Sequence, residues 1–161
     1  MRGVLWILLL ASSGCDWMPR DAAGALDRVR GGELRVGVSE HPPWVELRGG
    51  HVRGVEPELL ERWAKQLDAR VVWRHGVPAE LVEALHRREL DVLAAGFDAS
   101  TPYEPRLALT RPYLETVDRY GKRRKHVLAV TQGESALLLM LDRYLAAQDP
   151  AALRGRAQQP R

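Results

Sequence analysis

Several residue types are scarce in this chain of 161 residues or missing from it. It has a single cysteine, Cys15, so no internal disulfide can form, and it has three lysines and no asparagine. The basic charge therefore comes almost wholly from arginine, and the arginines are scattered among 21 acidic residues. A protein that binds nucleic acid would cluster its basic residues with aromatic side chains, so the pattern does not favour nucleic acid as a partner.

Sequence motifs of catalysis and of metal binding are also missing. The five histidines show no metal-ligand spacing such as HExxH. Ser39 lies beside Glu40 and His41 but lacks the glycines of a nucleophile elbow, and there is no phosphate-binding loop. We therefore expect no enzyme activity, no metal site and no cofactor.

No apolar run is long enough to cross a membrane. The longest extends from Val4 to Ala11, follows Arg2 and precedes small residues, which is the order of a secretory signal. Cys15 comes directly after those small residues. This arrangement resembles the bacterial lipoprotein signal, in which residues 1–14 are removed and Cys15 is lipidated. An uncleaved helix followed by a chance cysteine is the alternative.

The rest of the chain is sufficient for one domain, because 45% of the residues are hydrophobic and can form a core. Residues 15–32 carry proline, glycine and charges, and we expect them to form a tether. The polar tail, residues 149–161, is expected to be disordered. Regular periodicity begins at Glu33.

Strand and helix patterns alternate after this point. Apolar runs, several of them β-branched, predict strands at residues 34–38, 70–75, 91–97 and 126–130. Helical periodicity predicts three helices: one that begins at Pro57, one at residues 78–90 and one at residues 134–147. The pair Gly49-Gly50 predicts a hairpin turn. The strand, helix, strand order predicts an α/β fold with a mostly parallel sheet, covered by helices on both faces. Such sheets bind ligands at the carboxyl ends of their strands.

Four segments resemble, in order and spacing, the bacterial extracellular solute-binding proteins of family 3, which deliver amino acids and similar solutes to ABC importers. The segments lie within residues 33–113 and read LRVGVSEHPPWVE, GVEPELLERWAKQL, LVEALHRRELDVLAAGFDAST and LALTRPY. The fold of that family has two α/β lobes that close on the solute as a hinge. The resemblance therefore implies a periplasmic-binding-protein-like fold, a small polar solute and an ABC permease as partner.

The resemblance also implies ligand contacts in the first half of the chain. Trp44, in the segment PPW, would stack on the apolar part of the solute or on a cationic group. Glu56 stands where the family has an acid near the cleft, and it would meet an ammonium group. The alternative for Glu56 is a structural role as an acid at a helix N-terminus.

Further contacts are implied after the strand at residues 91–97. Asp98, Ser100 and Thr101 occupy the small polar positions of the family pattern. Arg106 is the nearest arginine to the family's carboxylate clamp, and a surface salt bridge is its alternative role. Many members have threonine where this chain has Asp98, which would repel a carboxylate. An unusual solute, or lost binding, follows from this difference.

The second lobe of the family has no counterpart in this sequence. In the family, the chain leaves lobe 1, forms a second lobe of about a hundred residues and then returns to lobe 1. In this sequence the segment HVLAV resembles the return, and only residues 114–125 precede it after the exit. The chain thus looks like lobe 1 alone, over residues 33–148, with a short bridge in place of lobe 2. One lobe supplies about half of the usual contacts, so we expect weak or absent binding unless a partner or a second copy covers the open cleft.

Other interpretations stay open at this stage. The chain fits a one-lobed lipoprotein interaction module that takes no part in transport, and it also fits a degenerate relic. The basic run GKRRK, residues 121–125, fits a solvated turn or a contact with anionic lipid. In the lipoprotein interpretation, lipidated Cys15 places the protein outside the cytoplasm and anchors it to the membrane.

Overall fold

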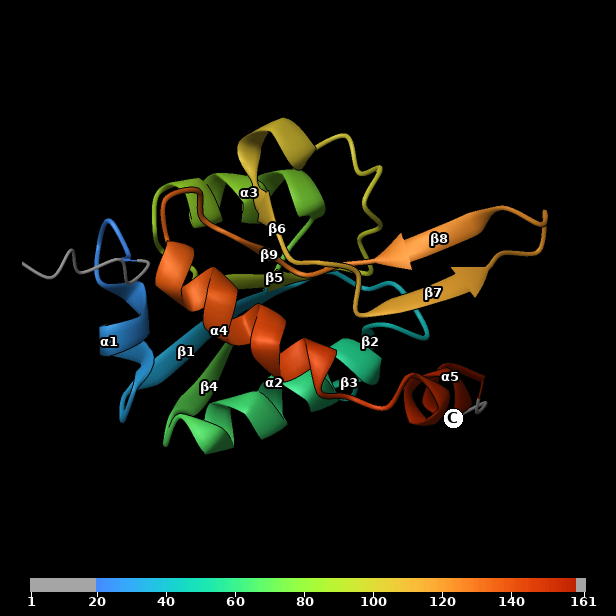
Figure 1. The fold of residues 1–161 in the computed structure, drawn as a ribbon, viewed down its shortest axis with the longest axis horizontal. Helices are drawn as coiled ribbons and strands as arrows, with labels where there is room; N and C mark the ends of the chain where they lie inside the picture. Colours follow the sequence, from blue (N-terminus) through green and yellow to red (C-terminus); the bar gives the residue numbers. More distant parts are fainter. Residues whose placement is uncertain (1–19, 159–161) are drawn as a thin grey trace, which may run out of the picture.

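A five-stranded sheet forms the centre of the structure, a computed structural model that describes residues 20–158 (Figure 1). The strand order is β4-β1-β5-β9-β6. The strands are β1 (Glu33–Val38), β4 (Arg70–His75), β5 (Val92–Ala94), β6 (Ala108–Leu109) and β9 (Ala129–Val130). β1 pairs in parallel with β4 and β5, whereas β9 runs antiparallel to β5 and β6. The predicted α/β fold with a mostly parallel sheet is confirmed.

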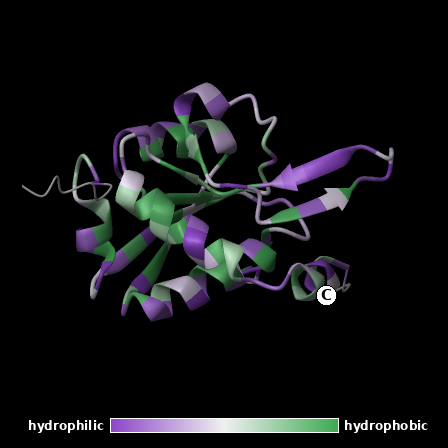
Figure 2. Ribbon diagram, viewed as in Figure 1, coloured by the Kyte–Doolittle hydropathy of each residue, from purple (hydrophilic) through white to green (hydrophobic). Residues whose placement is uncertain are grey.

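Helices cover both faces of this sheet and create two hydrophobic clusters. α2 (Val55–Gln66) and α4 (Ser135–Ala146) cover one face, and α3 (Pro78–His86) covers the other. Side chains alternate between the faces along β5, since Val92 and Ala94 belong to the first cluster and Leu93 to the second. Apolar residues accordingly gather in the strands and on the inner faces of the helices (Figure 2). The described residues therefore contain their own core.

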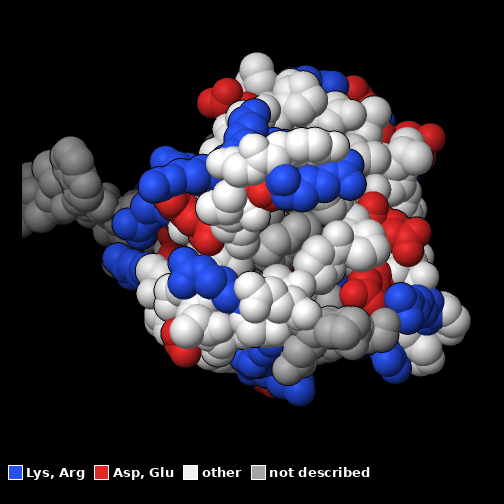
Figure 3. All heavy atoms as spheres, turned by 90° about the vertical axis from the view of Figure 1, so that its right-hand side faces the viewer, with Lys and Arg blue, Asp and Glu red and all other residues white. Residues whose placement is uncertain are grey.

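Two antiparallel hairpins are added to this core. β2 (Glu46–Arg48) and β3 (His51–Arg53) pair around Gly49-Gly50, as the turn signal predicts. β7 (Leu114–Val117) and β8 (Arg123–His126) pair with each other and project beyond the sheet (Figure 1). Figure 3 views the molecule from this end. The predicted strand at residues 126–130 is wrong as one unit, because the chain passes there from β8 into the central sheet at β9.

The segment that leads into β1 is not the simple tether expected for residues 15–32. α1 (Ala25–Val29) packs into the first hydrophobic cluster through Ala25, Leu26 and Val29. Arg28 of the same helix lies 2.8 Å from a carboxylate oxygen of the buried Asp91. Residues 1–14 and Cys15, assigned above to a signal and a lipid anchor, lie outside the described residues.

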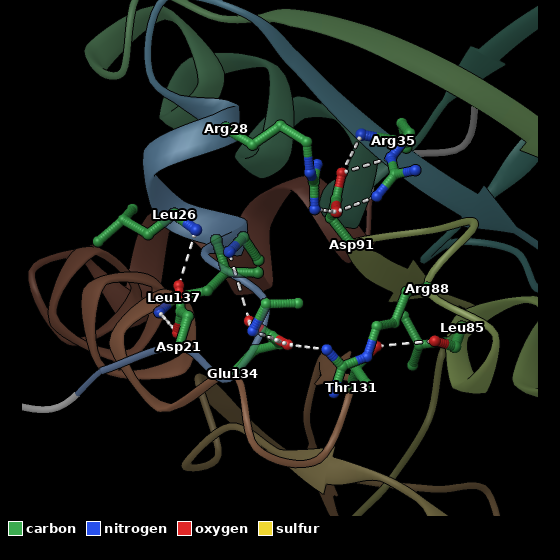
Figure 4. Close-up of polar contacts among 12 residues, drawn as sticks. Asp21, Leu26, Arg28, Arg35, Leu85, Arg88, Asp91, Thr131, Glu134 and Leu137 are labelled. Carbon is green, nitrogen blue, oxygen red and sulfur yellow. Dashed lines mark hydrogen bonds and ion pairs between the residues drawn. The ribbon is translucent and has the colours of Figure 1, made fainter.

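Two acidic side chains join this N-terminal segment to α4 (Figure 4). One oxygen of Asp21 accepts hydrogen bonds from the first amides of α4, those of Ala136 (2.7 Å) and Leu137 (2.9 Å). In return, Glu134 accepts a hydrogen bond from the amide of Ala25 (3.3 Å) at the start of α1. Each acid thus satisfies amides that a helix leaves unpaired at its N-terminus.

Replacing Asp21 with alanine is expected to lower the free energy of unfolding by about 1–2 kcal/mol, since the first amides of α4 lose their acceptor. Urea unfolding of residues 16–161 measures this change. Asp27→Ala is the matched control, because it removes the same charge from α1 at a side chain that is 87% exposed. Equal destabilisation by the two variants would contradict the proposed role of Asp21.

The C-terminal segment also differs from its prediction. The tail expected to be disordered from residue 149 onward instead forms α5 (Pro150–Gln158), and Leu153 of this helix is buried in the first cluster. Arg156 lies 3.5 Å from a carboxylate oxygen of Glu58 on α2. Within residues 20–158, no helix combines the length and the apolar character that crossing a membrane requires.

Candidate ligand-binding site

The carboxyl ends of β1, β4 and β5 meet at one edge of the sheet, where sheets of this kind bind ligands. Two loops form much of this edge, residues 39–45 after β1 and residues 95–101 after β5. The β7–β8 hairpin is joined to the second loop, because Asp98 forms a β-bridge with His126. The β7–β8 hairpin therefore contacts the candidate site directly.

Trp44 belongs to the first of these loops, and its ring is turned into the protein. The residue is only 7% exposed. Its ring centroid lies 3.7 Å from that of His126 on β8, and its ring meets that of Tyr113 edge-on at a centroid distance of 6.5 Å. The stacking partner of Trp44 is thus a side chain of its own chain, which attaches the hairpin to the loop after β1.

Glu56 lies in the first turn of α2 and is completely buried. One carboxylate oxygen accepts a hydrogen bond from the hydroxyl of Tyr113 (2.8 Å), and the other accepts one from the amide of Gly96 (3.0 Å). Burial raises the pKa of Glu56 to about 7, and the two hydrogen bonds only partly oppose this rise. Both oxygens are engaged by the protein, so Glu56 connects α2 with the loop after β5. This placement corresponds to the structural alternative given above for Glu56.

Asp98 lies at the carboxyl edge and is bound by the hairpin. One of its oxygens accepts a hydrogen bond from the amide of Ser100 (2.8 Å), and the other accepts one from the guanidinium of Arg124 on β8 (2.7 Å). The same guanidinium donates to Asp118 (3.0 Å). Partial burial opposes the charged form of Asp98, but the hydrogen bonds from Ser100 and Arg124 hold its pKa below the usual value. The carboxylate of Asp98 is therefore already paired with a cation of the same chain, Arg124.

Of the remaining predicted contacts, Ser100 and Thr101 lie beside Asp98, whereas Arg106 does not. Ser100 is exposed, Thr101 is buried, and the amide of Thr101 donates to the carbonyl of Asp98 in a tight turn (3.0 Å). Arg106 lies in the short 3-10 helix η1 (Glu104–Arg106), and its guanidinium pairs with Glu83 of α3 at 2.7 Å. The structure therefore brings Asp98 and Ser100 together and places Arg106 in the surface salt bridge named above as its alternative.

Three residues of the site were missed by sequence reasoning, namely Tyr113, Arg124 and His126. The hairpin has the two-residue period of a strand, so Arg124 and His126 face the body of the protein while Arg123 and Lys125 are exposed. The sequence KRRKH, residues 122–126, is compatible with this strand-like alternation. The alternation was overlooked because the basic run was interpreted as a solvated turn or a lipid contact.

His126 is held in its neutral form. Burial lowers its pKa to about 4, in spite of the opposing charge of Asp98. Its Nε2 atom lies 2.8 Å from the hydroxyl of Thr116, whereas the buried Nδ1 atom has no hydrogen-bond partner among the described residues. A proton on Nδ1 would therefore be poorly accommodated.

A groove of about 550 Å³ opens on the other side of β7, between the hairpin and α5. Its lining residues are Pro43, Trp44, Glu115, Thr116, Val117, Arg154, Ala157 and Gln158. For metals, residues 20–158 contain no group of three or more His, Cys, Asp or Glu side chains able to hold an ion.

Comparison with known proteins agrees with this architecture. The model of the bacterial extracellular solute-binding proteins, family 3, matches residues 34–150, which is more than half of the chain. The chain therefore belongs to this family. No curated protein matches it in sequence.

Solved structures show the same fold at low sequence identity. The arginine-bound domain 1 of TmArgBP is 20% identical with a TM-score of 0.66, and the match covers 76% of this chain and 98% of that one. For the Salmonella typhimurium periplasmic binding protein described as highly specific for arginine, the identity is 12% and the TM-score 0.66, with 79% and 99% of the chains covered. An ancestral amino-acid-binding protein, described as a precursor of cyclohexadienyl dehydratase, is 12% identical with a TM-score of 0.68, covering 82% and 96%. These matches show a single lobe of the periplasmic-binding-protein type.

Proposed function

We propose that this protein is the solute-binding component of an ABC importer for cationic amino acids and that one copy alone binds its solute weakly. Family membership and the fold support the solute class, and Asp98 at the carboxyl edge carries the proposal. In this account the protein has no enzymatic role. It is extracytoplasmic, and a lipid on Cys15 anchors it to the membrane and keeps it near its permease.

The contacts of Asp98 indicate why the solute would be cationic. Its carboxylate accepts a hydrogen bond from a guanidinium at 2.7 Å, and Ser100 fixes the position of the carboxylate. The guanidinium of a free arginine would form the same charge-assisted hydrogen bond. Two of the similar structures are described as arginine-binding, which agrees with this chemistry.

The same contacts explain the expected weakness. A solute must displace Arg124, which β8 holds beside Asp98 at a high effective concentration. Trp44 and Glu56 are buried against Tyr113 and supply no further contact in this arrangement. A second lobe, which would bury the other side of the solute, is replaced by the hairpin.

Calorimetric titration of residues 16–161 with a panel of amino acids tests the proposal. We expect arginine and lysine to bind in the millimolar range and neutral and acidic amino acids not to bind. The mass of the protein in solution must be measured in the same buffer, since a second copy covering the edge would strengthen binding. Micromolar binding by a proven monomer would contradict weak binding, and a preference for acidic amino acids would contradict the solute class.

Replacing Arg124 with alanine is expected to strengthen binding of arginine about tenfold or more, because the competing guanidinium is removed from Asp98. Calorimetry under the same conditions measures the change. Arg123→Ala is the matched control, since the neighbouring Arg123 is exposed and makes no contact with Asp98. The account fails if both variants, or neither, bind arginine more tightly.

A second candidate function is an interaction module that takes no part in transport. The pairing of Asp98 with Arg124 at the carboxyl edge favours it. In that case the hairpin and the edge would be presented to a protein partner. Permease and ATPase genes next to the gene of this protein would favour transport, and their absence would favour the module.

A further inference from the structure

The outer face and tip of the β7–β8 hairpin expose several cations beside apolar side chains. We call this surface the hairpin patch. It consists of Val117, Arg119, Tyr120, Lys122, Arg123 and Lys125, all of them exposed. Val117 is 65% exposed and Tyr120 is 78% exposed, and they are two of the three large apolar side chains that are exposed among residues 20–158. An exposed aromatic ring and an exposed valine therefore share one projecting element with four cations.

The cations of the hairpin patch are only weakly compensated. Residues 118–125 include five basic residues and one acid, Asp118, and that acid is paired with Arg124, which lies outside the patch. Lys125 lies 4.0 Å from Glu115, and both side chains are about half exposed. Within the described part of the chain, Arg119, Lys122 and Arg123 make no ion pair. The guanidinium of Arg119 lies over the ring of Tyr120 at 4.8 Å.

We propose that the hairpin patch binds the surface of an anionic phospholipid membrane. Cations near such a surface are attracted by its negative potential, and an amphipathic ring beside them suits the boundary between headgroups and acyl chains. The hairpin lies beyond the sheet, at the opposite end of the molecule from α1, so its tip can reach a flat surface before the body does (Figure 1). Seen from this end, the surface shows basic side chains grouped above the centre of the view (Figure 3).

A second copy of the chain fits this surface poorly. Two hairpins pairing through these faces would bring eight cations together against one exposed acid on each face, Glu115, and like charges across an interface oppose association. The partner must therefore supply negative charge. A membrane also accommodates Tyr120 and Val117, which a purely acidic surface would leave in contact with polar groups.

This inference goes beyond solute binding and does not depend on a lipid at Cys15. Residues 16–161 contain all the described elements and lack Cys15, and the structure gives them their own core. Co-sedimentation of this segment with vesicles of phosphatidylcholine, alone or mixed in equal amounts with phosphatidylglycerol, measures the contact. We expect binding to the mixed vesicles only, and we expect it to weaken as salt is added.

Variants distinguish the hairpin patch from general attraction by a basic protein. Changing Arg119, Lys122 and Arg123 to glutamine is expected to lower the partition coefficient on mixed vesicles on the order of 100-fold. Tyr120→Ser should lower it several-fold at unchanged charge. The matched control changes three exposed cations outside the hairpin to glutamine, namely Arg30, Lys65 and Arg143.

Circular dichroism and thermal melting check that each variant keeps its fold. The proposal is overturned if the control triple loses as much binding as the hairpin triple, or if neutral vesicles bind the wild type equally well. The proposal is also overturned if every folded hairpin variant still binds vesicles as well as the wild type. The partner of the hairpin patch would then be something other than a membrane.

Discussion

Above pH 7, the Glu56→Gln variant is expected to be more stable than the wild type by about 3 kcal/mol in free energy of unfolding, and near pH 4 the two proteins are expected to be equal. Glutamine resembles the protonated carboxyl, and it offers an oxygen to the amide of Gly96 and an NH₂ group to the hydroxyl of Tyr113. The wild type must instead bury a charged carboxylate at high pH, because Glu56 is fully buried and no cation pairs with it among the described residues.

The sign of the pH effect follows from the direction of the pKa shift. The pKa of Glu56 in the folded protein is about 7, above its ordinary value of 4.5, so the folded state binds the proton more tightly than the unfolded state. Stability from this group is fully present below pH 4.5 and is lost as the pH rises to about 7. His126 acts in the opposite sense, because burial lowers its pKa from 6.5 to about 4 and protonation destabilises the fold. The two effects partly cancel in the wild type.

Urea unfolding between pH 4 and pH 8, followed by tryptophan fluorescence, measures these profiles. We expect the stability of Glu56→Gln to rise with pH below 6.5, the ordinary pKa of His126, and the wild-type profile to be flatter. Glu61→Gln, at an exposed position of the same helix, should follow the wild type. Parallel profiles for Glu56→Gln and the wild type would show that the carboxyl titrates normally.

Trp44→Ala is expected to lower the free energy of unfolding by about 3–5 kcal/mol, which is typical of a buried aromatic side chain. The ring fills the space between the loop after β1 and the hairpin, in contact with His126 and Tyr113. Its loss leaves a cavity at the point where the hairpin is attached. Urea unfolding measures the change.

The matched control for this experiment is Tyr120→Ala, which removes an aromatic ring that is 78% exposed in the turn of the β7–β8 hairpin. We expect that change to alter stability by less than about 0.5 kcal/mol. If Trp44 were instead free to stack on a solute, its removal would weaken binding and leave stability nearly unchanged. Comparable stabilities of the Trp44→Ala and Tyr120→Ala variants would therefore contradict a structural role for Trp44.

Most of the fold was predictable because its central elements have strong periodicity. The strand predicted at residues 70–75 is β4 with the same bounds, and the helix predicted at residues 134–147 is α4 within one residue at each end. α1 was missed because five residues are too few to show a helical period, and α5 because Leu153 is its only buried side chain.

The candidate site was predictable in place but not in geometry. Trp44, Glu56 and Asp98 do lie at the carboxyl edge, as the strand order and the family resemblance imply. Their partners are set by tertiary packing, since Asp98 pairs with Arg124 across 26 residues of sequence. The alternation within KRRKH separates Arg124 and His126 from Arg123 and Lys125, but which of these two sets faces inward depends on the register of the strands.

The β7–β8 hairpin therefore has two consequences for the proposed function. The hairpin completes the edge of lobe 1 through His126 and Arg124, which supports folding of the single lobe. Under the proposed function it would also compete with a solute, because Arg124 of the hairpin already pairs with Asp98. In that case folding and solute binding compete for Asp98. The free energy of solute binding must then be favourable enough to release Arg124 from Asp98.

A titration of isotope-labelled residues 16–161 with L-arginine, followed by the NMR signals of the backbone amides, tests this central claim most directly. The account predicts shifts of the Ala99 and Ser100 amides beside Asp98 and of the Arg124 amide, growing without saturation up to millimolar arginine. Saturation at micromolar arginine in a monomer, or shifts confined to residues away from the carboxyl edge, would contradict it.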